Sequence, residues 1–249
     1  MKQLYLLLIL FILTSTQGQT SQNDSIYFWK SGLLLKKRSV KTADLDSITF
    51  KINYIKICEL VWAKKNLDVS TYSDGTNIPQ VTDATAWNNL TTGAWCYYGN
   101  NQANNAVYGK LYNWYAVAGI YDAASLANPA LRKKLAPTGW HVPADTEWTY
   151  LISCIGGANV AGGKMKETGT TYWSSPNTAA TNSTGFTGLP GGHRYGNTFT
   201  QIGSQGYWWS LSDANQSNAY VQQIGYFNAF ILSFLDSKQR GQSVRCIRD

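Results

Sequence analysis

Residues 135–157 read LAPTGWHVPADTEWTYLISCIGG, and this stretch has the clearest helical pattern in the chain. Its large apolar residues recur at the spacing of one helix face, namely Trp148, Leu151, Ile152 and Ile155. Asp145 is the predicted N-cap, and the pair Gly156–Gly157 ends the run. The sequence therefore predicts an amphipathic helix that begins after Asp145 and ends at Ile155.

A second helix is predicted over Tyr108–Gly119, which reads YGKLYNWYAVAG. Apolar and aromatic residues again recur at helical spacing, at Leu111, Trp114, Tyr115 and Ala118. Gly119 is a suitable helix end because glycine tolerates the left-handed conformation common there. We expect this helix to be short and buried.

The rest of this region favours strands. Val61–Ala63 is predicted to be a strand, and a polar loop follows over 70–92. After residue 185 the helical patterns stop, and short apolar runs alternate with Gly, Asn, Asp and Ser. These strand candidates are 207–209, 219–224, 230–234 and 243–247. Two early helices and a late group of strands predict an α+β domain.

The first residues have the layout of a secretory signal peptide. A basic start precedes an apolar run from Leu4 to Leu13, and Thr16 and Gly18 stand three and one residues before a cut. The alternative is a membrane anchor, but the run is much shorter than the roughly 20 residues that a bilayer requires. We expect residues 1–18 to be removed, leaving a secreted or cell-surface protein without a transmembrane anchor.

Residues 19–56 are expected to form a small N-terminal β unit. Ile26–Trp29 and Leu33–Leu35 flank a turn at 30–32, and Asp44–Phe50 alternates like a further strand. This segment resembles a compact element that many exported Bacteroidota proteins carry just after their leaders. The main domain is expected over 57–249.

Composition argues against a disordered protein and against a nucleic-acid-binding protein. The chain has 16 Tyr, 10 Trp and 8 Phe with only 14% charged residues, which argues against disorder. Its net charge of +7 is concentrated near the start of the chain. Residues 57–249 contain thirteen basic and eleven acidic residues, which is nearly neutral. A nucleic-acid partner is therefore not expected, since phosphate binding needs a basic stripe.

No catalytic pattern is visible. The four cysteines (Cys58, Cys96, Cys154 and Cys246) form no Cys-x-x-Cys motif, and in an exported protein they allow three disulfide pairings. Residues 158–165 approach a phosphate-binding loop but lack its first glycine and its hydroxyl, and no Gly-x-Ser-x-Gly elbow occurs. A pair of carboxylates that cleaves glycosides is not excluded, because the distance between two carboxylates depends on the three-dimensional structure and not on the sequence. We expect no enzyme activity, no cofactor and no metal.

Seven segments together resemble the Fibrobacter succinogenes major paralogous domain, a family of exported bacterial domains. They occur in family order from about residue 57 to the end, as 61–67 (VWAKKNL), 108–117 (YGKLYNWYAV), 135–143 (LAPTGWHVP), 163–169 (GKMKETG), 185–192 (GFTGLPGG), 206–210 (GYWWS) and 243–249 (SVRCIRD).

The resemblance implies a C-type-lectin-like fold related to the formylglycine-generating enzyme, with two helices packed on irregular antiparallel sheets. It implies no activity. Many relatives have Cys at the position of Ala136, so a disulfide from there to Cys246 is not available. Ala144 replaces a Ser or Thr and removes one side of a capping box with Glu147. A reactive cysteine pair is not evident, and the two histidines, His141 and His193, are too few for the iron-dependent relatives.

The stretch 190–215 is the predicted ligand-binding region. It combines glycines, rings and hydrogen-bonding side chains, and its candidate residues are His193, Arg194, Tyr195, Trp208, Trp209, Asp213 and Asn215. Adjacent residues of a strand face opposite sides, so we expect Trp208 or Trp209 to meet solvent. The alternative is that both are core residues. A calcium site at Asp213 and Asn215 is a further alternative.

These observations predict a non-catalytic binding module that recognises a glycan or a protein. The first alternative is a structural or assembly component of the bacterial cell surface. The second is a degenerate enzyme of the formylglycine-generating type. The ligand, the disulfide pairing and the oligomeric state stay open.

Overall fold

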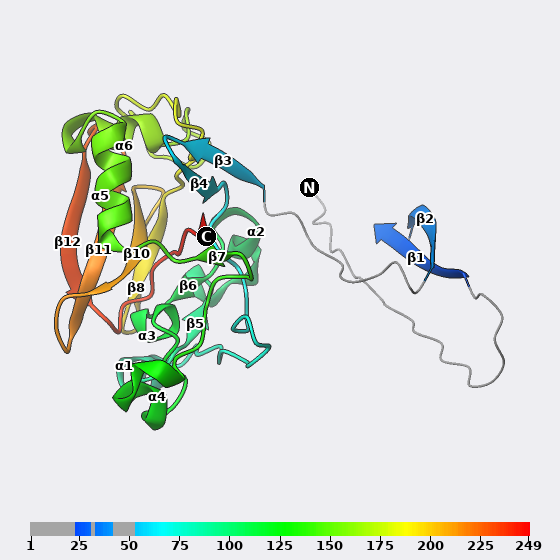
Figure 1. Ribbon diagram of the computed structural model, residues 1–249. Coiled ribbons are helices and arrows are strands. Elements are labelled where there is room, and N and C mark those ends of the chain that lie inside the picture. Colours follow the sequence, from blue (N-terminus) through cyan, green and yellow to red (C-terminus); the bar gives the residue numbers. More distant parts are fainter. Residues whose placement is uncertain (1–22, 31–32, 42–52) are drawn as a thin grey trace. The chain divides into compact units, whose positions relative to one another are not determined.

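The computed structural model describes residues 23–30, 33–41 and 53–249 (Figure 1). The chain divides into two compact units, residues 1–51 and 52–249. In the first unit, β1 (Asn23–Lys30) and β2 (Leu33–Lys41) pair as an antiparallel hairpin, as expected. The predicted leader, the turn residues 31–32 and the predicted strand at 44–50 lie outside the described residues.

The larger unit mixes helices with small antiparallel sheets, which confirms the α+β class. Its strands are β3 (Tyr54–Ile57), β4 (Leu60–Ala63), β5 (Trp95–Cys96), β6 (Leu111–Tyr112), β7 (Trp140–His141), β8 (Gly191–Tyr195), β9 (Thr198–Ile202), β10 (Gln205–Asp213), β11 (Asn218–Gly225), β12 (Ile231–Ser237) and β13 (Ile247–Arg248). Its helices are α1 (Ala84–Asn88), α2 (Asn105–Tyr108), α3 (Trp114–Val117), α4 (Ala123–Ala127), α5 (Asp145–Cys154) and α6 (Ala158–Met165), with 3₁₀ turns η2 (Tyr98–Asn100), η3 (Gln102–Asn104) and η4 (Pro129–Leu131).

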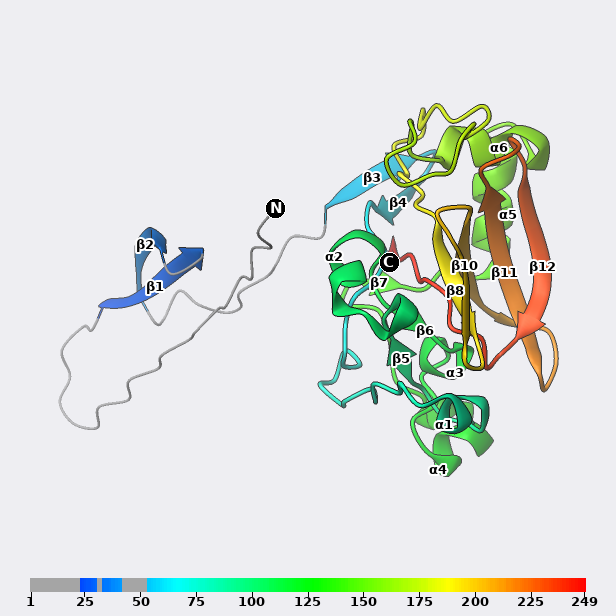
Figure 2. The ribbon, with the colours of Figure 1, turned by 180° about the vertical axis from the view of Figure 1, so that it is seen from behind.

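Two sheets organise this unit. One has the order β10-β11-β12, and the other has the order β3-β4-β13-β7. Helices α5 and α6 lie on one face of the β10-β11-β12 sheet, in front of it in Figure 1 and behind it in Figure 2. The hairpin β8-β9 lies beside β10 on the other side (Figure 2). No helix of the described segments has the length and apolarity to span a bilayer.

The predicted helix at 145–155 is present as α5. Its N-cap is Ala144 rather than Asp145, because the extended backbone persists for one residue after Pro143. The Glu147 side chain accepts the backbone N–H of Ala144 at 2.8 Å, which is the half of the capping box that the sequence retains. Trp148 and Leu151 are fully buried, so the predicted apolar face is the packing face.

The predicted helix at 108–119 is wrong. The segment instead forms the end of α2, strand β6 and the single turn α3. Gly109 interrupts it with φ +73°, and its backbone lies against the carbonyl of Leu67. Asn113 then starts a new turn, because its Oδ1 accepts the N–H groups of Ala94 and Ala116 at 2.9 and 3.0 Å. The apolar residues of 108–119 are buried from several separate elements, so their helical spacing does not mark the face of one helix.

The helix that accompanies α5 is α6, which the sequence pattern did not predict. Its two adjacent glycines, Gly162 and Gly163, disfavour a helix in isolation. A Cβ at Gly162 would stand 2.1 Å from the carbonyl oxygen of Phe230. Tertiary packing against the β11-β12 turn therefore requires the glycine that weakens the local helical signal.

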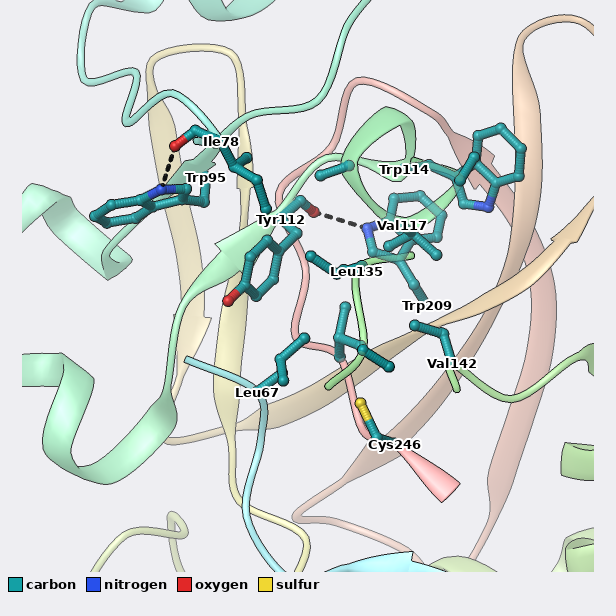
Figure 3. Close-up of a cluster of buried hydrophobic side chains, with 14 of the residues drawn as sticks. Leu67, Ile78, Trp95, Tyr112, Trp114, Val117, Leu135, Val142, Trp209 and Cys246 are labelled. Atoms are coloured by element: carbon teal, nitrogen blue, oxygen red, sulfur yellow. Dashed lines mark hydrogen bonds between the residues drawn. The ribbon is translucent and has the colours of Figure 1, made fainter. Parts of the chain in front are cut away.

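Two apolar clusters cover the two faces of β10. Trp209 belongs to the cluster in Figure 3, where its Nε1 donates to the carbonyl of Tyr112 at 2.8 Å. Trp208 belongs to the second cluster, together with Trp148 and Leu151 of α5. One indole of β10 therefore packs into each of the two clusters.

A buried polar node joins four distant segments. The Oδ1 of Asn66 accepts hydrogen bonds from Arg245 Nε and Nη2, at 3.1 and 2.9 Å, and from Trp208 Nε1 at 2.8 Å. Arg245 Nη1 donates to the carbonyls of Ala63 and Phe186 at 2.9 and 2.7 Å. Arg245 is 1% exposed, so these acceptors replace its entire hydration shell.

Covalent and ionic links fasten the outer elements. Cys58 and Cys154 form a disulfide across 96 residues, which ties the β3-β4 turn to the end of α5. His141 lies between two carboxylates, with Nδ1 2.7 Å from Asp249 Oδ1 and Nε2 3.0 Å from Glu147 Oε1. This clamp connects β7 to α5 and to the residue that follows β13.

We expect Asn66→Ala to lower the free energy of unfolding by at least about 3 kcal/mol, because it leaves the buried Arg245 guanidinium short of acceptors. Urea denaturation measures the change. Asn197→Ala is the control, since Asn197 is exposed and bonds only its neighbour Thr198. Equal stability of the two variants would contradict the role of the node.

The His141 clamp should stabilise the fold most at acidic pH. Burial opposes protonation of His141, but the hydrogen bonds and charges of Glu147 and Asp249 outweigh it and raise its pKa above 6.5. The contribution is complete below pH 6.5 and is lost as pH rises through the raised pKa. The stability difference between wild type and His141→Gln should therefore be larger at about pH 5.5 than at about pH 8.5. A larger difference at the alkaline pH would reverse this sign.

Candidate functional site

Arg194 cannot reach a ligand, which corrects its place among the candidate residues. It is 0% exposed, and its guanidinium packs 4.2 Å over the ring of Trp87. Its N–H groups donate to four backbone carbonyls, those of Val81, Thr82, Asp83 and Gly196. Arg194 faces inward on β8, so it anchors the β8-β9 hairpin to the loop before α1.

The expectation that Trp208 or Trp209 meets solvent is also wrong. The two indoles do face opposite sides of β10, but both are 0% exposed. The reason is that both faces of this strand are covered, one by α5 and α6 and the other by the cluster of Figure 3. The alternative reading, that both are core residues, holds.

Asp213 is the last residue of β10 and Asn215 lies in the turn that follows it, and both contact a lysine. Lys238 Nζ lies 3.0 Å from Asp213 Oδ2 and 2.7 Å from the carbonyl of Asn215. Asn215 Oδ1 accepts the backbone N–H groups of Ser217 and Asn218. A calcium ion at this turn would have to displace the Lys238 ammonium, which already occupies the convergence of these oxygens. We therefore set the calcium alternative aside.

Tyr195 and His193 are brought together by Arg240, a residue that the sequence did not single out. Tyr195 is 58% exposed, and the Arg240 guanidinium lies 4.5 Å from its ring centroid. Arg240 Nη1 lies 2.9 Å from His193 Nε2, and its Nε lies 2.7 Å from Asp236 Oδ1. The guanidinium is thereby fixed in position against one side of an otherwise exposed ring.

Amide side chains continue this surface from His193. The His193 ring packs edge-to-face on Tyr207 at 4.8 Å. The hydroxyl of Tyr207 contacts the amide oxygens of Gln201 and Gln205, and Gln223 Nε2 in turn contacts Gln205 Oε1. Gln201 has φ +67°, a left-handed conformation that is unfavourable for residues with a side chain. Such backbone strain occurs preferentially at functional positions.

We define the Tyr195 face as this connected set of side chains. Its outer members are Tyr195, Gln201, Gln205, Gln223 and Arg240, and the buried residues beneath them are His193 and Tyr207. No motif marked the glutamines or Arg240, because they come from four separate elements and meet only in three dimensions.

The two buried residues beneath the Tyr195 face, His193 and Tyr207, are uncharged at neutral pH. Burial and the charge of Arg240 lower the pKa of His193 to about 4, so its imidazole is uncharged at neutral pH. Because His193 Nε2 accepts from Arg240, its proton is assigned to Nδ1, which is buried without a partner among the described residues. Burial also raises the pKa of Tyr207 to about 12. The face can offer donors and acceptors, but it has no group ready to transfer a proton near neutral pH.

The thiols do not form a reactive pair. Cys58 and Cys154 are joined in the disulfide, and Cys96 and Cys246 are buried. Burial raises the pKa of Cys96 to about 11 and that of Cys246 to about 12. Cys246 lies inside the apolar cluster of Figure 3. Both free cysteines have the environment of inert core residues.

A surface hollow of about 310 Å³ lies elsewhere, between the loops at 69–75 and 135–138. Its lining combines Val69 and Leu135 with Thr71 and Ser73, and no member of the Tyr195 face contributes to it. No group of three metal-ligating side chains occurs in the segments that the structure describes.

The fold and the site define an α+β domain whose sequence motifs build the core and whose open face comes from residues outside them. Residues 55–248 match the Fibrobacter succinogenes major domain. The chain belongs to this family, which confirms the resemblance. Neither the curated proteins nor the solved structures contain a match to the chain.

Because Trp209 is buried and Tyr195 is exposed, their replacement should affect stability very differently. Trp209→Ala should lower the free energy of unfolding by about 3–5 kcal/mol, because it opens a cavity in the main core. Tyr195→Ala should change it by less than about 0.5 kcal/mol, because that ring is largely exposed. Chemical denaturation of both variants tests the assignment, and a stable Trp209→Ala protein would refute the burial of this side chain.

Proposed function

We propose that the protein is an exported, non-catalytic binding module that recognises a carbohydrate through the Tyr195 face. The observation that carries the proposal is the exposed Tyr195 ring, which is fixed by Arg240. Through His193 and Tyr207 it is linked to a group of glutamine amides. Exposed rings stack on the apolar faces of sugars, and amides and guanidinium groups pair with hydroxyls. This chemistry suits a glycan better than an apolar protein surface.

The fold we propose for the main domain is C-type-lectin-like. Its support is the packing of α5 and α6 on small antiparallel sheets, together with the long irregular segment 166–190 between α6 and β8. In such an arrangement the loops and hairpin ends are the surfaces free to vary.

Export is proposed from the leader-like residues 1–18, and the Cys58–Cys154 disulfide supports it. Structural disulfides persist in oxidising compartments and are rare in the cytosol. The absence of a reactive thiol argues against the formylglycine-generating alternative.

A structural or assembly role at the cell surface is the second candidate. Strand β12 lies at the end of its sheet, and its Leu232 and Leu235 are 49% and 46% exposed. Exposed apolar edge strands are surfaces on which chains associate.

A glycan array probed with the full-length exported protein tests the proposal. Tyr195→Ala and Gln205→Ala should each weaken binding to the recognised glycan by about tenfold, the loss of one stacking or hydrogen-bonding group. Tyr150→Ala is the matched control, because Tyr150 is 44% exposed on α5, away from this face. Binding that survives both test substitutions would refute the site, and a blank array would favour the assembly role.

A further inference from the structure

A second aromatic surface lies on the opposite side of the β8-β9 hairpin. Tyr98 packs edge-to-face on Phe199 at 5.4 Å, and Phe199 is the register partner of Arg194, which faces away from Tyr195. Next to it, Tyr108 packs edge-to-face on Tyr172 at 6.2 Å. We call Tyr98, Tyr108, Tyr172 and Glu167 the Tyr108 cluster. Each of its members is partly exposed.

Two glycines bring the backbone of β8 directly against these rings. A Cβ at Gly192 would stand 2.9 Å from the ring of Tyr98, and a Cβ at Gly191 would lie 3.6 Å from Tyr108. The two rings therefore flank the same dipeptide, although they come from η2 and α2.

Glu167 is the charged member of the cluster, and it has no partner. Within residues 53–249 its carboxylate makes no hydrogen bond and no ion pair, and partial burial raises its pKa. The neighbouring Lys166 does not compensate it, because Lys166 is 0% exposed and its Nζ donates to the carbonyls of Thr178, Gly225 and Asn228. A partly desolvated, unpaired carboxylate costs free energy that a bound cation would recover.

The Glu167 carboxylate acts on the hydroxyl of Tyr108, which places it near the rings. Burial raises the pKa of Tyr108, and Tyr172, Glu167 and Tyr98 raise it further. Tyrosine hydroxyls are uncharged at neutral pH, so Glu167 is the member of this group that carries a negative charge. Tyrosine rings themselves present a negative π face.

We infer that the Tyr108 cluster binds an organic cation, with an alkylammonium group held against the tyrosine rings and Glu167 as its counter-charge. Rings around an ammonium group attract it through their quadrupoles, and a nearby carboxylate adds direct charge pairing. A neutral sugar would leave Glu167 without a counter-ion. This inference does not depend on the glycan proposal, since the two surfaces share no residue.

Titration of the full-length protein with choline, followed by calorimetry or by NMR of the tyrosine side chains, tests the inference. The neutral isostere 3,3-dimethylbutan-1-ol is the matched ligand. Choline should bind saturably, and the isostere should bind about tenfold more weakly, since only the charge differs. Equal binding of the two ligands, or no saturable binding of choline, would overturn the inference.

Variants locate the site. Glu167→Gln and Tyr172→Leu should each weaken choline binding by about tenfold, whereas Tyr150→Ala should leave it unchanged. The Glu167→Gln substitution breaks no contact and removes an unpaired, partly buried charge, so the variant should unfold at the wild-type temperature or slightly above it. Unchanged choline binding in both cluster variants would place the cation elsewhere and refute the assignment.

Discussion

The buried guanidinium of Arg245 constrains the rest of the domain. A charged group that is 1% exposed must find all its hydrogen-bond partners inside the protein, and Arg245 finds them on Ala63, Asn66 and Phe186. Trp208 donates to the same Asn66 oxygen. Segments that are up to 182 residues apart must therefore meet at one point, which fixes the β3-β4-β13-β7 sheet relative to β10.

This constraint explains why the sequence motifs reveal the family but not the ligand. Asn66, Phe186, Trp208 and Arg245 belong to four of the segments that carry the resemblance, and each is used for packing or for internal hydrogen bonds. The residues of the Tyr195 face lie almost entirely outside those segments. A substitution at an exposed residue of that face, such as Tyr195, leaves the core untouched, so it should cost little stability.

The sequence predicted the elements whose signals are local. The apolar face of α5 and the strands β4, β10, β11 and β12 were predicted correctly, because the spacing of apolar residues and the turn residues between them indicate these elements directly. The opposite orientation of Trp208 and Trp209 was also correct. Their burial could not be predicted, since Trp208 is covered by α5 and α6 and Trp209 by the cluster of Figure 3. The glycines of α6 are explained only by the approach of Phe230. The same applies to Arg240, which meets His193 only through tertiary folding.

The β8-β9 hairpin contributes to both surfaces for which we propose binding. Two strands alone are marginally stable, yet Arg194 fastens this hairpin to three consecutive carbonyls of the loop before α1, and a bridge to Gly241 fastens it again. The buried arginine therefore fixes a hairpin that has different chemistry next to its two sides, amides and Arg240 beside one and tyrosines with Glu167 beside the other. Because the same anchor holds the hairpin between them, each of the two proposed ligands would meet a surface that is already formed.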